Sequence, residues 1–210
     1  MNIALPFFSG FITASVGTAL PGLINMSAAK ISMRDGRERA FLFIFGALII
    51  VFLQTLSAVL FARYIDSRPD VIVLLREVGF AIFALLAIYF LVLAKRPKLD
   101  SDDSHTRSKT SRFFLGMLLS ALNFFPVPYY VFITISLATY QLFSFEMISI
   151  STFLCGVTLG SSSVFYYYIN FFEKIEAKTD FFFRNMNQII GTITGLVALI
   201  TLCNIIKYYC

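Results

Sequence analysis

Long charge-free runs make up most of the chain, and the charged residues gather between them. Six runs contain no Asp, Glu, Lys or Arg: 3–29, 40–62, 78–94, 113–145, 147–172 and 185–206. A helix needs about 20 mainly apolar residues to cross about 30 Å of hydrocarbon, and the runs are of this order. They do not alternate in polarity as the strands of an outer-membrane barrel do. The pattern therefore predicts an all-α integral membrane protein with six transmembrane helices.

Composition and charge agree with a membrane location. The chain is 58% hydrophobic and 14% charged. With six spans, the segments 30–39, 95–112 and 173–184 fall on one side as loops and hold 13 of the 17 Lys and Arg residues. Because short loops rich in Lys and Arg stay cytoplasmic, both termini are expected outside. The net charge of +5 then comes from basic loops that set the topology and face the lipid bilayer, and nucleic acid is not an expected partner.

A polar segment at 96–112 divides the single transmembrane domain, 1–210, into repeat one, 1–95, and repeat two, 113–210. The sequence 43-FIFG-46 in the second span resembles 153-FLCG-156 in the fifth, and 22-GLIN-25 resembles 120-SALN-123. Since each repeat has three spans, an odd number, the second must be inverted relative to the first. Inverted repeats with discontinuous helices near the midplane recur in transporters.

The first and fourth spans contain signals for a break. A helix over residues 3–33 would be about 46 Å long, more than the hydrocarbon needs. Pro21 has no N–H to donate, and Gly22 permits an unusual backbone path. In the fourth span Pro126 and Pro128 act in the same way. The sequence therefore predicts discontinuous first and fourth helices, whose free backbone groups face protein or a water-filled cavity.

Polar residues beside the breaks are candidates for a translocation site. Asn25 and Asn123 lie close to the bilayer centre when counted from their own basic loops, although an intramembrane Asn also serves as a helix-to-helix hydrogen-bond partner. Lys30 either extends to the cytoplasm or receives a substrate carboxylate. Gln54 is interpreted as a packing or interfacial group. The predicted substrate-binding and translocation residues are Pro21, Gly22, Asn25, Lys30, Asn123 and Pro126.

Small residues at helical spacing predict close helix packing. Gly156 and Gly160 form one small-xxx-small pattern, and Gly191 and Gly195 form another. These glycines are expected to pack the fifth and sixth spans together, or to pack against a second subunit in a homodimer. The aromatic run 165–168 near the inner loop is interpreted as part of an interfacial belt.

At these residues the chain resembles the lysine exporter (LysE/RhtB) family of bacterial inner-membrane amino-acid exporters. That family has a Pro-Gly-Pro-Asn break in the first span, a Gly-Arg-Arg turn before the second and Asn-Pro-Lys in the fourth. The positions that match are Pro21 and Gly22 in the first motif, Gly36, Arg37 and Arg39 in the turn, and Asn123 in the third. The resemblance implies a multi-pass exporter in the bacterial cytoplasmic membrane, without a cofactor.

Some positions depart from the family pattern. Leu23 replaces the second Pro, Asn25 is displaced by one place, and 123-NFFP-126 stands where Asn-Pro-Lys is expected. The layout of six spans and a polar central linker resembles the family over essentially the whole chain. The departures bear on the substrate more than on the fold.

Several functions fit a six-span protein. The preferred hypothesis is export of amino acids or related small zwitterions by alternating access. A rhomboid-type protease needs a base beside its serine, yet the sole histidine, His105, lies in the central linker, so no enzyme is predicted. A divalent-cation exporter needs hard oxygen ligands within the membrane, whereas the acidic residues lie in loops or at span ends; no metal site is predicted. That exporter and a non-transporting assembly or signalling protein stay open as alternatives.

Overall fold

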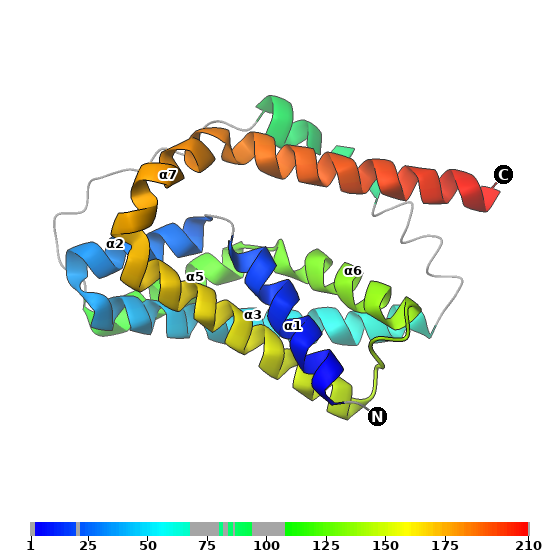
Figure 1. Cartoon of the computed structure of the whole chain (residues 1–210), viewed down its shortest axis with the longest axis horizontal. Coiled ribbons are helices and arrows are strands. Elements are labelled where there is room, and N and C mark those ends of the chain that lie inside the picture. The colour runs from blue at the N-terminus through cyan, green and yellow to red at the C-terminus, as the bar shows by residue number, and fades with distance from the viewer. Residues whose placement is uncertain are drawn as a thin grey trace. The chain divides into compact units, whose positions relative to one another are not determined.

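The computed structural model describes residues 3–19, 22–67, 80–81, 84–85, 87–93 and 108–209, with the backbone alone for most positions after 171. Within these residues the regular structure is helical, as Figure 1 shows. The elements are α1 (Ala4–Ala19), α2 (Leu23–Asp35), α3 (Arg37–Asp66), the π-helix η1 (Tyr89–Leu93), α5 (Lys109–Leu122), α6 (Pro126–Thr139) and α7 (Met147–Tyr209). The predicted all-α class is confirmed for the described chain.

Candidate membrane spans occur both as long helices and as bent pairs. By length and composition, α3 and the Met147–Phe171 part of α7 can each cross a membrane. Two pairs pass the same test together: α1 with α2, bent by 72°, and α5 with α6, bent by 60°. The described residues thus hold two to four candidate spans, and the first and fourth predicted spans are both broken. The predicted third span lies mostly outside the described residues, so the six-helix inverted layout stays a prediction.

One segment expected as a loop is helical. The backbone of α7 continues through residues 173–184, where the sequence analysis places an inner loop. No Gly or Pro lies between Gly160 and Gly191, and the polar stretch 173-EKIEAK-178 consists mostly of good helix formers. Charge alone does not end a helix, so the polar segment extends α7. Similarly, α5 begins at Lys109, within the predicted linker 96–112.

The described chain forms two compact units. The first, Met1–Tyr64 with Asp103–Ile175, contains both broken pairs, nearly all of α3 and the first part of α7. The second, Ile65–Asp102 with Glu176–Cys210, contains η1 and the C-terminal part of α7. In the second unit Gly191 lies against the Leu91 side chain, and Gly195 lies near Ala87. The predicted translocation residues all belong to the first unit.

In the first unit, α1 and α7 approach closely at glycines. A Cβ atom on Gly156 would clash with the carbonyl oxygen of Phe7, and one on Gly10 would clash with that of Phe153. At Gly160 a Cβ would lie 2.5 Å from the carbonyl oxygen of Phe11. The partner of Gly156 and Gly160 is therefore α1, which corrects the expectation that they face the sixth span. The reason is that Gly10 gives α1 a matching gap.

A second crossing of the same kind joins α3 and α5. A Cβ on Gly46 would clash with the carbonyl oxygen of Phe113, and one on Gly116 would clash with that of Phe43. The two segments matched in the sequence, 43-FIFG-46 and 153-FLCG-156, thus make equivalent contacts. Each segment packs its Phe carbonyl and its Gly against the N-terminal half of a broken span in the other predicted repeat.

Two apolar clusters hold the halves of the first broken span separately. The first cluster draws on α1, α3, α6 and α7, and its buried members are Ala14, Val51, Ala58, Val59, Tyr130, Phe143, Ile150, Phe153, Leu154 and Val157. The second draws on α2, α3 and α7, and its members are Ile24, Ala28, Ile31, Ala40, Phe43, Ile44, Ala47, Phe165 and Ile169. Because α1 and α2 are anchored in different clusters, the break between them is held by packing on both sides.

Candidate functional site: two broken helices

The first break separates α1 from α2. Gly22 precedes α2 in an extended conformation, φ −118° and ψ 178°, and as the N-cap residue it has no side chain with which to cap the helix. The first N–H groups of a helix have no acceptor within the helix, so this end favours an anion. Gly22 is half-buried. Pro21 lies outside the described residues, and its predicted role in the break stays a prediction.

Side chains satisfy the carbonyl groups at the end of α1. Asn25 is 4% exposed, and its Nδ2 donates to the carbonyl oxygen of Thr18 at 2.6 Å. The Tyr168 hydroxyl, from α7, donates to the carbonyl oxygen of Ala19 at 3.0 Å and also hydrogen-bonds the Asn25 side chain. These carbonyls would otherwise lack partners, because the helix stops before it can supply donors. Asn25 and Tyr168 therefore fix the end of α1 beside the uncapped start of α2.

Further polar groups line the same region. The Ser161 side chain on α7 is fully buried, and its Oγ lies 3.3 Å from Oγ1 of Thr18. Ser161 also hydrogen-bonds the Tyr130 hydroxyl. On the other side of α1, the Tyr129 hydroxyl donates to the carbonyl oxygen of Thr13 at 2.8 Å. Polar side chains of α6 and α7 thus converge on α1 within an apolar surrounding.

The second break separates α5 from α6. Asn123 follows the last residue of α5, and its backbone N–H donates to the carbonyl oxygen of Ser120 at 3.1 Å. Pro126 opens α6 and is half-buried. Proline is well suited to this position because its missing N–H has no helical acceptor there. Pro128 removes another N–H group from the start of α6. Between the two prolines, the N–H of Val127 donates to the carbonyl oxygen of Phe124 at 3.3 Å.

Gln54, on α3, secures this second break. Its Nε2 donates to the carbonyl oxygens of Ser120 at 3.2 Å and Asn123 at 3.0 Å. The interpretation of Gln54 as a packing or interfacial group thus gains a specific content, because two hydrogen bonds join α3 to the end of α5. Its amide supplies the donors that α5 loses when the helix stops.

Asn25 and Asn123 do not occupy equivalent positions. The sequence match aligned 22-GLIN-25 with 120-SALN-123, but Asn25 is the third residue after its break whereas Asn123 comes directly before its own. Asn25 is buried and Asn123 is exposed. Lys30 is half-buried, five residues beyond Asn25 on α2. The four-residue resemblance was misleading because residues 22–25 contain the start of α2, whereas residues 120–123 contain the end of α5.

The ends of α2 and α5 meet through an ion pair. Asp35, whose side chain is fully buried, pairs with Arg112, whose side chain is 10% exposed. Arg39 also donates from Nη1 to the carbonyl oxygen of Asp35 at 2.8 Å. A second pair, Glu38 with Lys109, is exposed. The two broken spans are therefore joined at the end that carries the basic residues.

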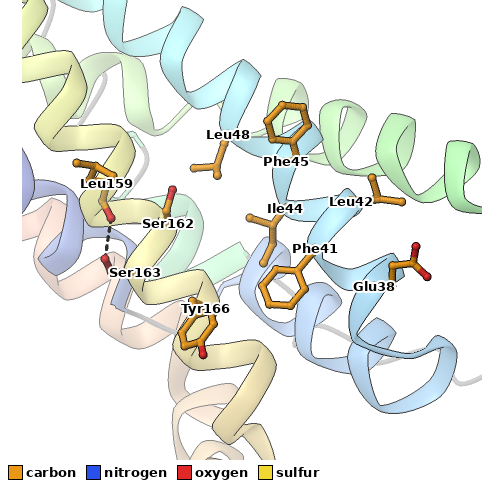
Figure 2. Close-up of a pocket in the computed structure, with 10 residues that line it drawn as sticks. All are labelled: Glu38, Phe41, Leu42, Ile44, Phe45, Leu48, Leu159, Ser162, Ser163 and Tyr166. Carbon is orange, nitrogen blue, oxygen red and sulfur yellow. Dashed lines mark hydrogen bonds between the residues drawn. The ribbon is translucent and has the colours of Figure 1, made fainter.

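A pocket of about 730 Å³ lies elsewhere in the first unit, between α3 and α7. Figure 2 shows side chains from both helices on its sides, among them Phe41, Phe45 and Tyr166. The residues predicted for translocation do not line it. Its few polar side chains include Ser163, whose hydroxyl donates to the carbonyl oxygen of Leu159 at 2.8 Å. This lining suits hydrocarbon better than a zwitterion, so the pocket is not the candidate site.

The sequence analysis missed four residues at the breaks: Tyr168, Ser161, Gln54 and Ser120. Tyr168 was placed in an interfacial belt, but it is 6% exposed. Ser161 directly follows Gly160, and its place beside that small-xxx-small pattern was the signal that the sequence offered. Gln54 and Ser120 lie on different helices, 66 residues apart in the chain, and their contact had no local signal. Among the described residues, no group of three or more His, Cys, Asp or Glu side chains forms a potential metal site.

An all-helical membrane protein whose spans break beside buried polar groups has the architecture of a transporter. The chain belongs to the LysE type translocator family, which it matches over residues 15–204. The match confirms the suspected family, and this is a family of transporters for amino acids or related compounds. No curated protein and no solved structure matches the chain.

Proposed function

We propose that the protein exports amino acids or related small zwitterions from the cytoplasm by alternating access. The observation that carries this proposal is the uncapped start of α2 beside the buried cluster of Asn25, Tyr168 and Ser161. A carboxylate suits this helix end, because N–H groups and the helix dipole both favour an anion. The half-buried Lys30, farther along α2, adds positive charge for the same group.

The paired architecture supports alternating access. The α1–α7 and α3–α5 crossings use equivalent segments of the two proposed repeats, as an inverted repeat would require. The Asp35–Arg112 pair joins α2 to α5 at the basic end. If that end faces the cytoplasm, the pair holds the inner side closed, and it must separate for substrate to enter.

Efflux from intact cells tests the substrate class. Cells overproducing the protein should tolerate an otherwise toxic load of one or more amino acids and should accumulate less of them internally. Cells producing Asn25→Leu at the same membrane level are the control, and they should behave like cells without the protein. A broad amino-acid panel without effect, together with altered efflux in a divalent-metal panel, would instead identify a metal exporter.

Thiol labelling tests the proposed orientation in the bacterial cytoplasmic membrane, with both termini outside. In a Cys155→Ala, Cys203→Ala background, an impermeant reagent should label Cys210 in cells stripped of their outer barrier. A cysteine introduced at Ser104 should react only after lysis. The opposite pattern would reverse the orientation.

A further inference from the structure

We infer that the end of α5 carries a second subsite, formed by Oε1 of Gln54 and Oγ of Ser120, which binds the ammonium group of the transported zwitterion. This ammonium subsite rests on the proposed function, because it supplies the second half of substrate recognition. It uses neither of the two asparagines, and it lies at the second break instead of the first.

The orientation of the Gln54 amide follows from its partners. Two backbone carbonyl oxygens, those of Ser120 and Asn123, lie 3.2 and 3.0 Å from one end of the amide. Only the NH₂ end can donate to both, so Oε1 must point elsewhere. That oxygen is buried and has no hydrogen-bond partner within the described part of the chain. A buried acceptor without a donor costs about 1 to 3 kcal/mol, which a ligand N–H group would offset.

Ser120 presents a second acceptor in the same place. The residue is 1% exposed, and its Oγ likewise has no hydrogen-bond partner among the described residues. Serine within a helix ordinarily donates to the carbonyl four residues earlier, as Ser57 does to Leu53 at 2.8 Å. The bond from Gln54 to the Ser120 carbonyl shows that the two residues are neighbours at the end of α5. Two buried oxygen acceptors at one break, neither with a partner among the described residues, indicate a ligand.

The surroundings of the subsite favour a cation. The C-terminal end of α5 carries partial negative charge, and no basic residue lies in its last turn. Across the break, Pro126 and Pro128 remove N–H groups that would attract an anion. An ammonium group has three N–H donors, which match neutral oxygen acceptors. A divalent ion would call for carboxylates, and Gln54 and Ser120 offer none. The exposed Asn123 beside the subsite leaves one side open.

Ser120→Ala is the variant that separates recognition from structure. Because Oγ of Ser120 has no partner among the residues that the structure describes, its removal should leave folding intact and Gln54 in place. Hydrogen bonds to charged groups are stronger than neutral ones, so the variant should weaken zwitterion affinity about tenfold or more. Ser57→Ala, which removes a hydroxyl bonded within its own helix, is the matched control and should leave affinity unchanged.

Two measurements on the full-length protein test the subsite. The first is the thermal unfolding midpoint in detergent with methylammonium chloride, sodium chloride or potassium chloride, each against choline chloride at equal ionic strength. Methylammonium should raise the midpoint of the wild type and Ser57→Ala, and should raise that of Ser120→Ala less. If sodium or potassium does so and methylammonium does not, the site binds a metal cation and the ammonium assignment is overturned. An equal methylammonium response in all three proteins also overturns it.

The second measurement is the KM for efflux from proteoliposomes, with the amino acid that the cell assay identifies. A raised KM in Ser120→Ala, with an unchanged KM in Ser57→Ala, supports the subsite. Efflux with the same KM in all three proteins overturns the subsite and leaves the proposed function standing. If no amino acid is transported, yet the methylammonium response depends on Ser120, the cation site stands and the proposed function fails.

Discussion

At the first break, Asn25 and Tyr168 satisfy the carbonyl oxygens of α1, and the start of α2 has no side-chain cap. At the second break, prolines remove N–H groups from α6, and Gln54 satisfies carbonyl oxygens at the end of α5 while its own oxygen has no partner in the described part of the chain. The first break therefore presents donors, and the second presents acceptors.

This difference shows how two similar backbones acquire opposite chemistry. The bends are alike, 72° and 60°, and the helices around them cross at equivalent glycines. A few side chains decide which backbone groups are already bonded. We therefore expect the first break to bind the carboxylate of a zwitterion and the second break to bind its ammonium group.

The largest expected effect comes from breaking the link between the two broken spans. Asp35→Asn leaves the buried Arg112 without its opposite charge, which should lower the free energy of unfolding by about 3 to 5 kcal/mol. Denaturation of the purified wild type and variant measures this difference in the free energy of unfolding. Glu38→Gln, at the exposed pair with Lys109, should cause no measurable change. Equal stability of Asp35→Asn and wild type would mean that the breaks are held independently.

The next largest effect is expected at the first break. Asn25→Leu removes the donor to the Thr18 carbonyl and a partner of Tyr168, which should cost about 1 to 3 kcal/mol of stability. Efflux from proteoliposomes should fall by tenfold or more. Asn170→Leu is the control, because the bond that the described residues give Asn170 is to the Tyr166 carbonyl of its own helix. Normal efflux by Asn25→Leu would mean that Asn25 serves helix packing alone and does not contribute to transport.

The position of the breaks could be predicted from the sequence, but their chemistry could not. Charge-free runs give the membrane class, and a proline beyond the first turn of a helix removes a hydrogen bond and kinks or breaks the helix. The bonding partners are long-range. Tyr168 is 149 residues from Ala19, and Gln54 is 66 residues from Ser120. Such contacts depend on how the helices pack, which local patterns do not encode.

A smaller effect is expected from Gln54→Leu at the second break. The change leaves the carbonyl oxygens of Ser120 and Asn123 without their donor, so stability should fall by about 1 to 2 kcal/mol. Gln54→Glu keeps an oxygen acceptor but lacks the NH₂ group, so it cannot make both hydrogen bonds to the carbonyl oxygens of Ser120 and Asn123. It should therefore lose similar stability while retaining more affinity for methylammonium than Gln54→Leu. If Gln54→Leu unfolds like the wild type, the second break does not need this amide.

The smallest effect is expected from Asn123→Leu, and it decides whether the two breaks differ at all. The Asn123 side chain is exposed, and the residue serves the break through its backbone, which donates to Ser120 and accepts from Gln54. Leucine preserves both backbone groups, so stability should change by no more than about 0.5 kcal/mol. Initial efflux rates from proteoliposomes at matched protein density should fall less than about threefold, against tenfold or more for Asn25→Leu. If Asn123→Leu abolishes efflux as completely as Asn25→Leu, both asparagines contact the substrate, and the breaks form a symmetric pair in which one asparagine side chain at each break carries recognition.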